Sequence, residues 1–181
     1  MNQTLKDELL SMSEEDQQVL QELIDNGELG TIEYHPRMKA VHEKNTARIK
    51  EIIDQYGWPG FKKVGKEGSK AAWLIVQHAV LDKDFMDKCL ALLKEASTRG
   101  EAEGWYLAYL QDRVLTMSGK QQIYGTQHDI DDNGIAYPLP IEDAEKVAGL
   151  RKEIGLEPLF EATRRIQERH NAAVANRENN D

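Results

Sequence analysis

Residues 71–81 form an apolar segment, Ala-Ala-Trp-Leu-Ile-Val-Gln-His-Ala-Val-Leu, that must be shielded from water. Wound as a helix, the segment is apolar around nearly its whole circumference, and such a helix is stable in water only when other elements surround it. The segment is too short to span a bilayer. It therefore predicts a central helix over about residues 70–81 in a mainly α, single-domain helical bundle.

Apolar residues recur at helical spacing elsewhere, which predicts further helices around the central one. Ser13 and Asp16 are spaced as a capping box at the start of the first of them. Ser69 can cap the central helix after a Gly-rich, basic connection at residues 57–68, and a helix N-terminus there can hold an anion. The expected outer helices cover residues 14–25, 36–56, 84–98, 101–117, 142–153 and 158–170.

Residues 121–139 break the helical pattern. Two short runs, 121–127 and 135–139, flank Asp132-Asn133-Gly134, and an Asn-Gly pair readily adopts the positive φ angles of a tight turn. We expect a small β-hairpin here. Along the chain as a whole we expect an acidic helical segment at residues 1–30, one helical domain at 31–171 and a frayed tail at 172–181.

Composition excludes several classes of function. The 181 residues carry a formal net charge of −9, so the mean field repels phosphate backbones and we expect no nucleic-acid binding. No run approaches the ~18 apolar residues of a membrane span, and the amino terminus lacks the pattern of a signal peptide. The one cysteine, Cys89, excludes an intrachain disulfide, lies in an apolar pattern that predicts burial, and fits a cytoplasmic location.

Charge is concentrated at the amino terminus, where residues 1–30 contain one lysine and eight acidic residues. This block is either the solvated face of a helix or a docking arm for a basic protein partner. Its regular apolar spacing favours the solvated face.

Gln77 and His78 are polar residues inside the apolar central segment. An unpaired buried polar group costs ~1–3 kcal/mol, so neighbouring elements must offer both side chains partners. Two interpretations are open. They form a hydrogen-bonded core pair, or His78 is a general base or metal ligand that lines a pocket.

Asp112 and Arg113 lie together on the predicted helix 101–117. They fit an ion pair with another helix, or an arginine that anchors a substrate carboxylate or phosphate beside an orienting aspartate. Further along, strand alternation places one set of polar residues on the same face: Gln122, Tyr124, Thr126 and His128. That face forms a polar pocket only if it turns towards His78.

No metal site is assigned from the sequence. Residues 129–134 match the first half of an EF-hand loop, but position twelve is Pro140 where calcium needs a bidentate glutamate, so a hairpin turn explains the segment. No closely spaced His or Cys ligand pair is present, and His42, His78 and His128 could meet only through the fold. The cofactor is unknown.

The polar residues also belong to motifs with a recognisable order: Gly57-Trp58-Pro59, Val64-Gly65, Ser69, Ala72-Trp73-Leu74-Ile75-Val76-Gln77-His78-Ala79, Tyr109-Leu110, Asp112-Arg113-Val114, Gly119-Lys120, Gln122 and Tyr124-Gly125-Thr126-Gln127. Over about residues 40–160 the chain resembles a widespread bacterial family of uncharacterised proteins, a domain of unknown function. The resemblance implies no activity. It implies that one shared feature includes Gln77, His78, Asp112, Arg113, Gln122, Tyr124, Thr126 and Gln127.

Two functions follow as hypotheses. The first is an acid–base enzyme for a small anionic substrate, in which His78 moves a proton, Asp112 orients His78 or Arg113, and Arg113 holds the anionic group. Hydrogen bonds to the substrate would come from Gln77, Gln122, Tyr124, Thr126 and Gln127. The second is a non-catalytic interaction or immunity-type module that uses the acidic helix 14–25 to bind a basic partner.

Overall fold

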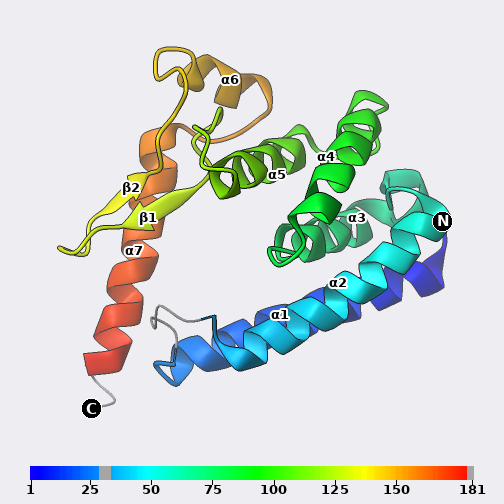
Figure 1. Ribbon diagram of the computed structural model, residues 1–181, viewed down its shortest axis with the longest axis horizontal. Coiled ribbons are helices and arrows are strands. Elements are labelled where there is room, and N and C mark those ends of the chain that lie inside the picture. Colours follow the sequence, from blue (N-terminus) through cyan, green and yellow to red (C-terminus); the bar gives the residue numbers. More distant parts are fainter. Residues whose placement is uncertain (29–33, 179–181) are drawn as a thin grey trace. The chain divides into compact units, whose positions relative to one another are not determined.

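The structure, a computed structural model, describes residues 1–28 and 34–178 (Figure 1). The described chain is mainly α-helical with one small antiparallel hairpin, which confirms the predicted fold class. None of the described helices has both the length and the apolar character that a membrane span needs. The elements are α1 (Gln3–Asp25), α2 (Pro36–Tyr56), α3 (Phe61–Gln77), α4 (Lys83–Thr98), α5 (Gly104–Met117), β1 (His128–Ile130), β2 (Ala136–Pro138), α6 (Val147–Glu153) and α7 (Leu159–Glu178).

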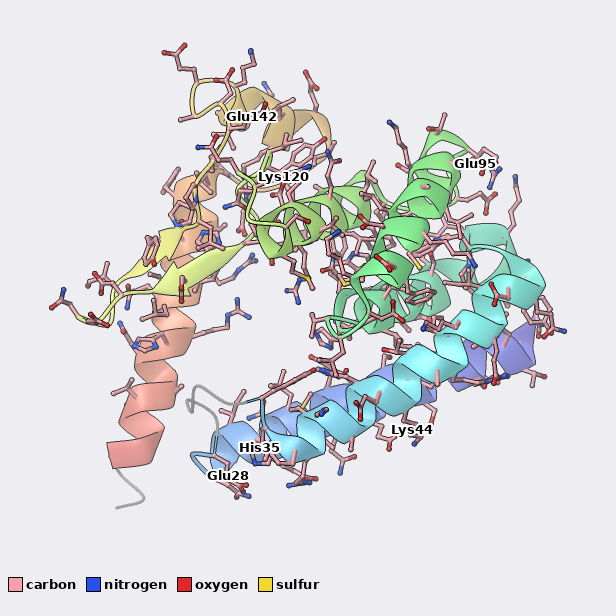
Figure 2. All side chains as sticks on the ribbon, in the orientation of Figure 1. Glu28, His35, Lys44, Glu95, Lys120 and Glu142 are labelled. Atoms are coloured by element: carbon pink, nitrogen blue, oxygen red, sulfur yellow. The ribbon has the colours of Figure 1, made fainter. Side chains whose placement is uncertain are left out.

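The chain divides into two compact units, Met1–Tyr106 and Leu107–Asp181, and each is described by itself. In the first unit, α1 and α2 run antiparallel side by side, and α3 packs against both of them (Figure 1). Ion pairs join the outer faces of α1 and α2, with Glu15 bound to Lys44, which Figure 2 labels on α2. The core between the three helices is apolar and includes Leu9, Leu23, Ile49, Ile52, Val64 and Val76.

Helix α1 begins much earlier than predicted. Asn2 is its N-cap and accepts a hydrogen bond from the backbone N of Leu5 at 3.1 Å. The predicted capping box at Ser13 and Asp16 is wrong, because the hydroxyl of Ser13 donates to the carbonyl of Leu10 and Asp16 is buried in mid-helix. The apolar stripe that begins at Leu5 extends the helix through this point.

Helix α3 also begins earlier than predicted, at Phe61, so most of the expected connection at 57–68 is helical with a kink at Gly65. Ser69 is buried inside α3 and is not a cap. The helix ends at Gln77, so the predicted range of 70–81 is wrong at its carboxyl end and His78 is the C-cap. Asp82 then caps α4 by accepting a hydrogen bond from the backbone of Phe85.

The second unit contains most of α5, the hairpin, α6 and α7. The predicted hairpin is confirmed, with its strands paired His128–Pro138, Asp129–Tyr137 and Ile130–Ala136. Its first strand, His128–Ile130, follows the predicted run 121–127, which is wrong as a strand because these residues form a loop with one isolated bridge, between Gln122 and Ile141. Helix α6 starts at Val147, because the side chain of Asp143 holds the preceding residues in a turn.

Candidate functional site

Asp16, His42 and His78 meet in the first unit. Asp16 lies on α1, His42 on α2, and His78 directly follows α3. The Nδ1 atom of His78 is 2.9 Å and 2.8 Å from the two carboxylate oxygens of Asp16, and Nε2 of His42 is 2.9 Å from Oδ2. The ring centroids of the two histidines are 4.7 Å apart. We call these three residues the Asp–His–His cluster.

Packing of the three helices places the cluster. Asp16 continues the buried face of α1 that includes Met12, and His42 lies on the buried face of α2 with Asn45. The side-chain amide of Asn45 donates to the carbonyl of Met12 at 3.2 Å, which fixes α2 against α1 one turn from Asp16. Because α3 ends at Gln77, the side chain of His78 leaves the helix at this junction.

The carboxylate of Asp16 is the buried charge of the cluster, with 1% of the residue exposed. Burial by itself would raise the pKa of Asp16, but contacts with His42 and then His78 outweigh burial and hold that pKa well below its ordinary value. The amide of Gln17 adds a further hydrogen bond to Oδ1 at 2.9 Å. Asp16 is therefore ionised at neutral pH.

An ionised carboxylate only accepts hydrogen bonds, so the Nδ1 atom of His78, which is hydrogen-bonded to Asp16, carries a proton. Nε2 of His42 lies at ion-pair distance from Asp16 but makes no hydrogen bond to it. The remaining nitrogen of His42, Nδ1, is in hydrogen-bond contact with the hydroxyl of Tyr34. The remaining nitrogen of His78, Nε2, has no hydrogen-bond partner among the described residues and is not one of the buried polar atoms.

A cavity of about 260 Å³ lies beside the cluster. Both histidines line it, together with Thr46, Lys50 and Leu81. The ammonium group of Lys50 contacts the carboxylate of Asp82, which also lines the cavity. His78 therefore borders a space that is large enough for a small molecule.

The same three residues are the group among the described residues that could hold a metal ion. One ligand atom from each of Asp16, His42 and His78 lies within 4.8 Å of the others. Two histidines and one carboxylate are a familiar ligand set for divalent transition metals. Binding would require the Nδ1 atom of His78, which is hydrogen-bonded to Asp16, to lose its proton, since a metal takes the ring lone pair.

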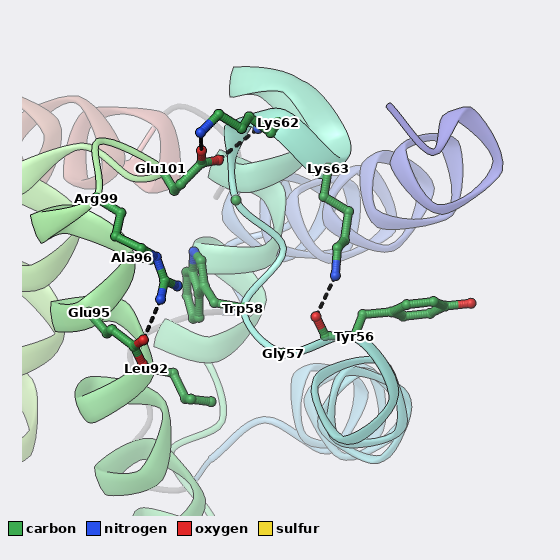
Figure 3. A pocket seen from close by; sticks show the side chains of 11 residues that line it. Tyr56, Gly57, Trp58, Lys62, Lys63, Leu92, Glu95, Ala96, Arg99 and Glu101 are labelled. Carbon is green, nitrogen blue, oxygen red and sulfur yellow. Dashed lines mark hydrogen bonds and ion pairs between the residues drawn. The ribbon is translucent and has the colours of Figure 1, made fainter.

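A second cavity of the first unit, about 400 Å³, lies at the turn formed by residues 57–60 (Figure 3). Its charged side chains pair with one another: Lys62 with Glu101 at 2.9 Å, and Arg99 with Glu95. The carboxylate of Glu101 also accepts a hydrogen bond from the backbone N of Lys62 at 2.8 Å. The first turn of α3 thus already has an anion, which is supplied by the chain itself.

Residues 3–174 match a family of unknown function, DUF6624. The chain belongs to this family. The match confirms the resemblance to a family of uncharacterised proteins and extends it to α1, which carries Asp16. No curated protein and no solved structure matches the chain.

The motifs singled out in the sequence contribute residues to both units. Gln77 and His78 lie in the first unit, whereas Asp112, Arg113 and the motif around residues 122–127 lie in the second. Gln77 is buried and precedes His78 at the end of α3.

Asp112 is fully buried in the second unit and organises the loop after α5. Its carboxylate accepts hydrogen bonds from the backbone N–H groups of Ile123, Tyr124 and Thr126 and from the Thr126 hydroxyl, at 2.8–3.1 Å. A carboxylate with this many donors and no access to solvent has the environment of a structural anchor.

Gln122 and Arg151 complete this anchor. The side-chain amide of Gln122 donates to the carbonyls of Gln127 and Leu139, and its oxygen accepts from the backbone N of Gln127. Arg151, which is 1% exposed, donates to the carbonyl of Tyr124 at 2.7 Å. Two of the predicted substrate-binding residues thus take part in holding the loop: Gln122 through its buried side chain and Tyr124 through its backbone N–H and carbonyl groups.

Sequence reasoning missed Asp16 and His42 as partners of His78. The signal for Asp16 was its register, because it continues the buried stripe of Leu5, Leu9 and Met12. The signal for His42 was similar, as a polar residue on the apolar stripe of α2. A charged residue in the register of a buried stripe requires a partner, and here two imidazoles provide it.

Proposed function

We propose that the first unit is an acid–base enzyme in which His78 transfers a proton to or from a small substrate. One observation carries this proposal: the buried carboxylate of Asp16 binds His78 at Nδ1, while Nε2 has no hydrogen-bond partner among the described residues and His78 lines a cavity. A general base needs a ring nitrogen free to accept a proton and a second group that fixes the ring.

In this proposal Asp16 is a positioning residue. It selects the tautomer of His78 that leaves the Nε2 lone pair directed away from the carboxylate, and it stabilises the imidazolium that forms after proton transfer. His42 shares the same carboxylate and links the cluster to Tyr34. Proton transfer by a positioned histidine contributes roughly 10²–10⁴-fold to a rate.

The cavity supports a small substrate, since its 260 Å³ lies just below the ~300–1,000 Å³ of sites for drug-sized ligands. Lys50 is the cation of the lining and would hold an anionic group of the substrate. That group would have to compete with Asp82 for the ammonium, so the affinity for an anion in this cavity should be modest.

The experiment is a turnover screen with p-nitrophenyl phosphate, p-nitrophenyl acetate and bis-p-nitrophenyl phosphate. We expect the wild-type protein to turn over at least one of them, His78→Ala to lose ~10²-fold or more, and added imidazole to restore part of the loss. His170→Ala, which removes a histidine of the second unit, is the matched control and should retain full activity. An active His78→Ala variant would contradict the proposal.

The alternative of a docking helix for a basic partner finds less support. Three carboxylates of α1 already pair with basic residues of α2: Glu8 with Arg48, Glu15 with Lys44 and Glu22 with Arg37. These pairs reduce the negative charge that a partner would meet. No observation specific to a protein interface offsets this.

A further inference from the structure

The second unit contains a polar cavity of about 270 Å³ that the proposed function does not use. Two helices and the segment before the hairpin line it. Helix α5 contributes Arg113, helix α7 contributes Arg165 and Arg169, and the intervening segment contributes Thr126, Gln127 and His128. All of these residues belong to the same unit.

Positive charge dominates this lining. Three guanidinium groups border the cavity, and none of the residues that line it is acidic. Arg165 and Arg169 are four positions apart on α7, a spacing at which like charges repel each other on a helix surface. Arg165 is paired with Glu157, whereas Arg169 forms no ion pair with a described residue. An anion in the cavity would relieve this repulsion.

The polar part of the lining is held in place by hydrogen bonds. The amide of Gln127 donates to the hydroxyl of Thr126 at 3.0 Å, and that hydroxyl donates to the buried carboxylate of Asp112. His128 contacts the hydroxyl of Thr163 at 2.9 Å. Asp112, through Thr126, therefore positions Gln127 at the cavity, and Thr163 positions His128 there, before any ligand arrives.

Burial lowers the pKa of His128, and the nearby charges of Arg151 and Arg169 lower it further. His128 is neutral at physiological pH, so the charge that a ligand meets comes from the arginines.

We propose that this cavity binds the phosphate group of a small phosphomonoester. The planar fork of arginine suits phosphate oxygens, and a phosphomonoester carries close to two negative charges at neutral pH, which matches several guanidinium groups better than a single carboxylate does. At ~30 Å³ per water molecule, the cavity has the volume of roughly nine waters, more than an inorganic ion fills. The remaining space adjoins Tyr109 and Ile166, against which an organic group can pack.

The test is isothermal titration of the full chain with phenyl phosphate at constant ionic strength, with benzoate as a singly charged ligand of similar size. We expect saturable binding of phenyl phosphate and at least tenfold weaker binding of benzoate. Arg169→Gln, an exposed substitution that should not affect folding, should weaken phenyl phosphate binding tenfold or more. Arg113→Gln should do the same, with its melting temperature measured alongside.

Arg164→Gln is the matched control. Arg164 lies on the same helix and pairs with Glu161 and Glu168, but it does not line the cavity, so its loss should leave the affinity unchanged. His78→Ala should also bind normally, which separates this inference from the proposed function. Absence of saturable binding, or an equal loss in Arg164→Gln and Arg169→Gln, would overturn the proposal.

Discussion

The Nδ1 atom of His78 lies 2.8 Å from Oδ2 of Asp16, although the two residues are 62 positions apart in the chain. The contact joins α1 to the end of α3, which are packed elements of the same unit. The group that orients the candidate base is therefore also a buried charge on which the packing of α1 depends. Stability and site geometry should respond to the same substitutions.

Asp16→Asn should destabilise the protein strongly. The substitution keeps the size of the side chain but removes the charge that two imidazoles face, and removal of one partner of a buried charged group costs about 3–5 kcal/mol. The neighbouring Glu15→Gln removes only a partly exposed partner of Lys44 and should cost less than about 1 kcal/mol. Urea denaturation of both variants measures the difference. Equal effects would show that Asp16 is not a buried structural charge.

The contribution of Asp16 should be lost in acid. Although burial raises the pKa of Asp16, its contacts with His42 and His78 hold it below the ordinary value, so the folded state binds the proton less readily than the unfolded state. The stabilisation is thus complete above about pH 4, the unfolded value, and falls as the pH is lowered towards the folded pKa. The difference in free energy of unfolding between wild type and Asp16→Asn should shrink below about pH 4. A difference independent of pH down to pH 3 would contradict this.

Chelation should leave the protein unchanged. The Nδ1 atom of His78 carries a proton in its hydrogen bond to Asp16, and a metal could bind that nitrogen only by displacing the proton. Dialysis against EDTA should therefore alter neither the melting temperature nor the turnover found in the screen. A lower melting temperature after EDTA, restored by Zn²⁺, would identify the cluster as a metal centre instead.

Gly125 should be among the least replaceable residues of the second unit. It has φ of +67°, and an added Cβ would lie 2.8 Å from Cδ1 of Leu159 and 3.0 Å from Cδ1 of Ile141. Gly119 has nearly the same φ, +68°, but open space around it. Gly119→Ala should cost about 1–2 kcal/mol from backbone strain alone, and Gly125→Ala roughly 1–3 kcal/mol more from crowding. Denaturation measures the free energy of unfolding of both alanine variants. Gly125→Ala should be the less stable of the two, and the difference between them gives the cost of crowding.

Helix boundaries were predictable where the signals were local. The start of α4 follows from Asp82, the N-cap residue, whose side chain accepts a hydrogen bond from the backbone N of Phe85, three positions further on. The start of α3 could not be predicted from the local sequence. Its first backbone N–H groups, those of Phe61 and Lys62, donate to the carbonyl and carboxylate of Glu101, some forty residues away. A contact of this kind depends on the tertiary fold and leaves no local pattern.

The candidate site was predictable only in part, again because some of its contacts depend on the tertiary fold. The position of His78 in an apolar segment indicated a polar partner, but the partner's identity depends on how α1 and α2 pack against α3. Asp112 and Arg113 are adjacent in sequence and differ in environment: Asp112 is fully buried under a loop, and Arg113 lines a cavity. Spacing alone does not separate the anchor from the candidate ligand-binding residue.

The position of the ring proton on neutral His78 decides whether this residue can serve as the base. Long-range ¹H–¹⁵N correlation spectra of the wild-type protein, recorded under conditions in which the ring is neutral, distinguish the two tautomers. We predict a proton on Nδ1, held by Asp16, and an unprotonated Nε2. A proton on Nε2 would mean that the lone pair faces Asp16 and not the cavity, and the acid–base function would have to be abandoned.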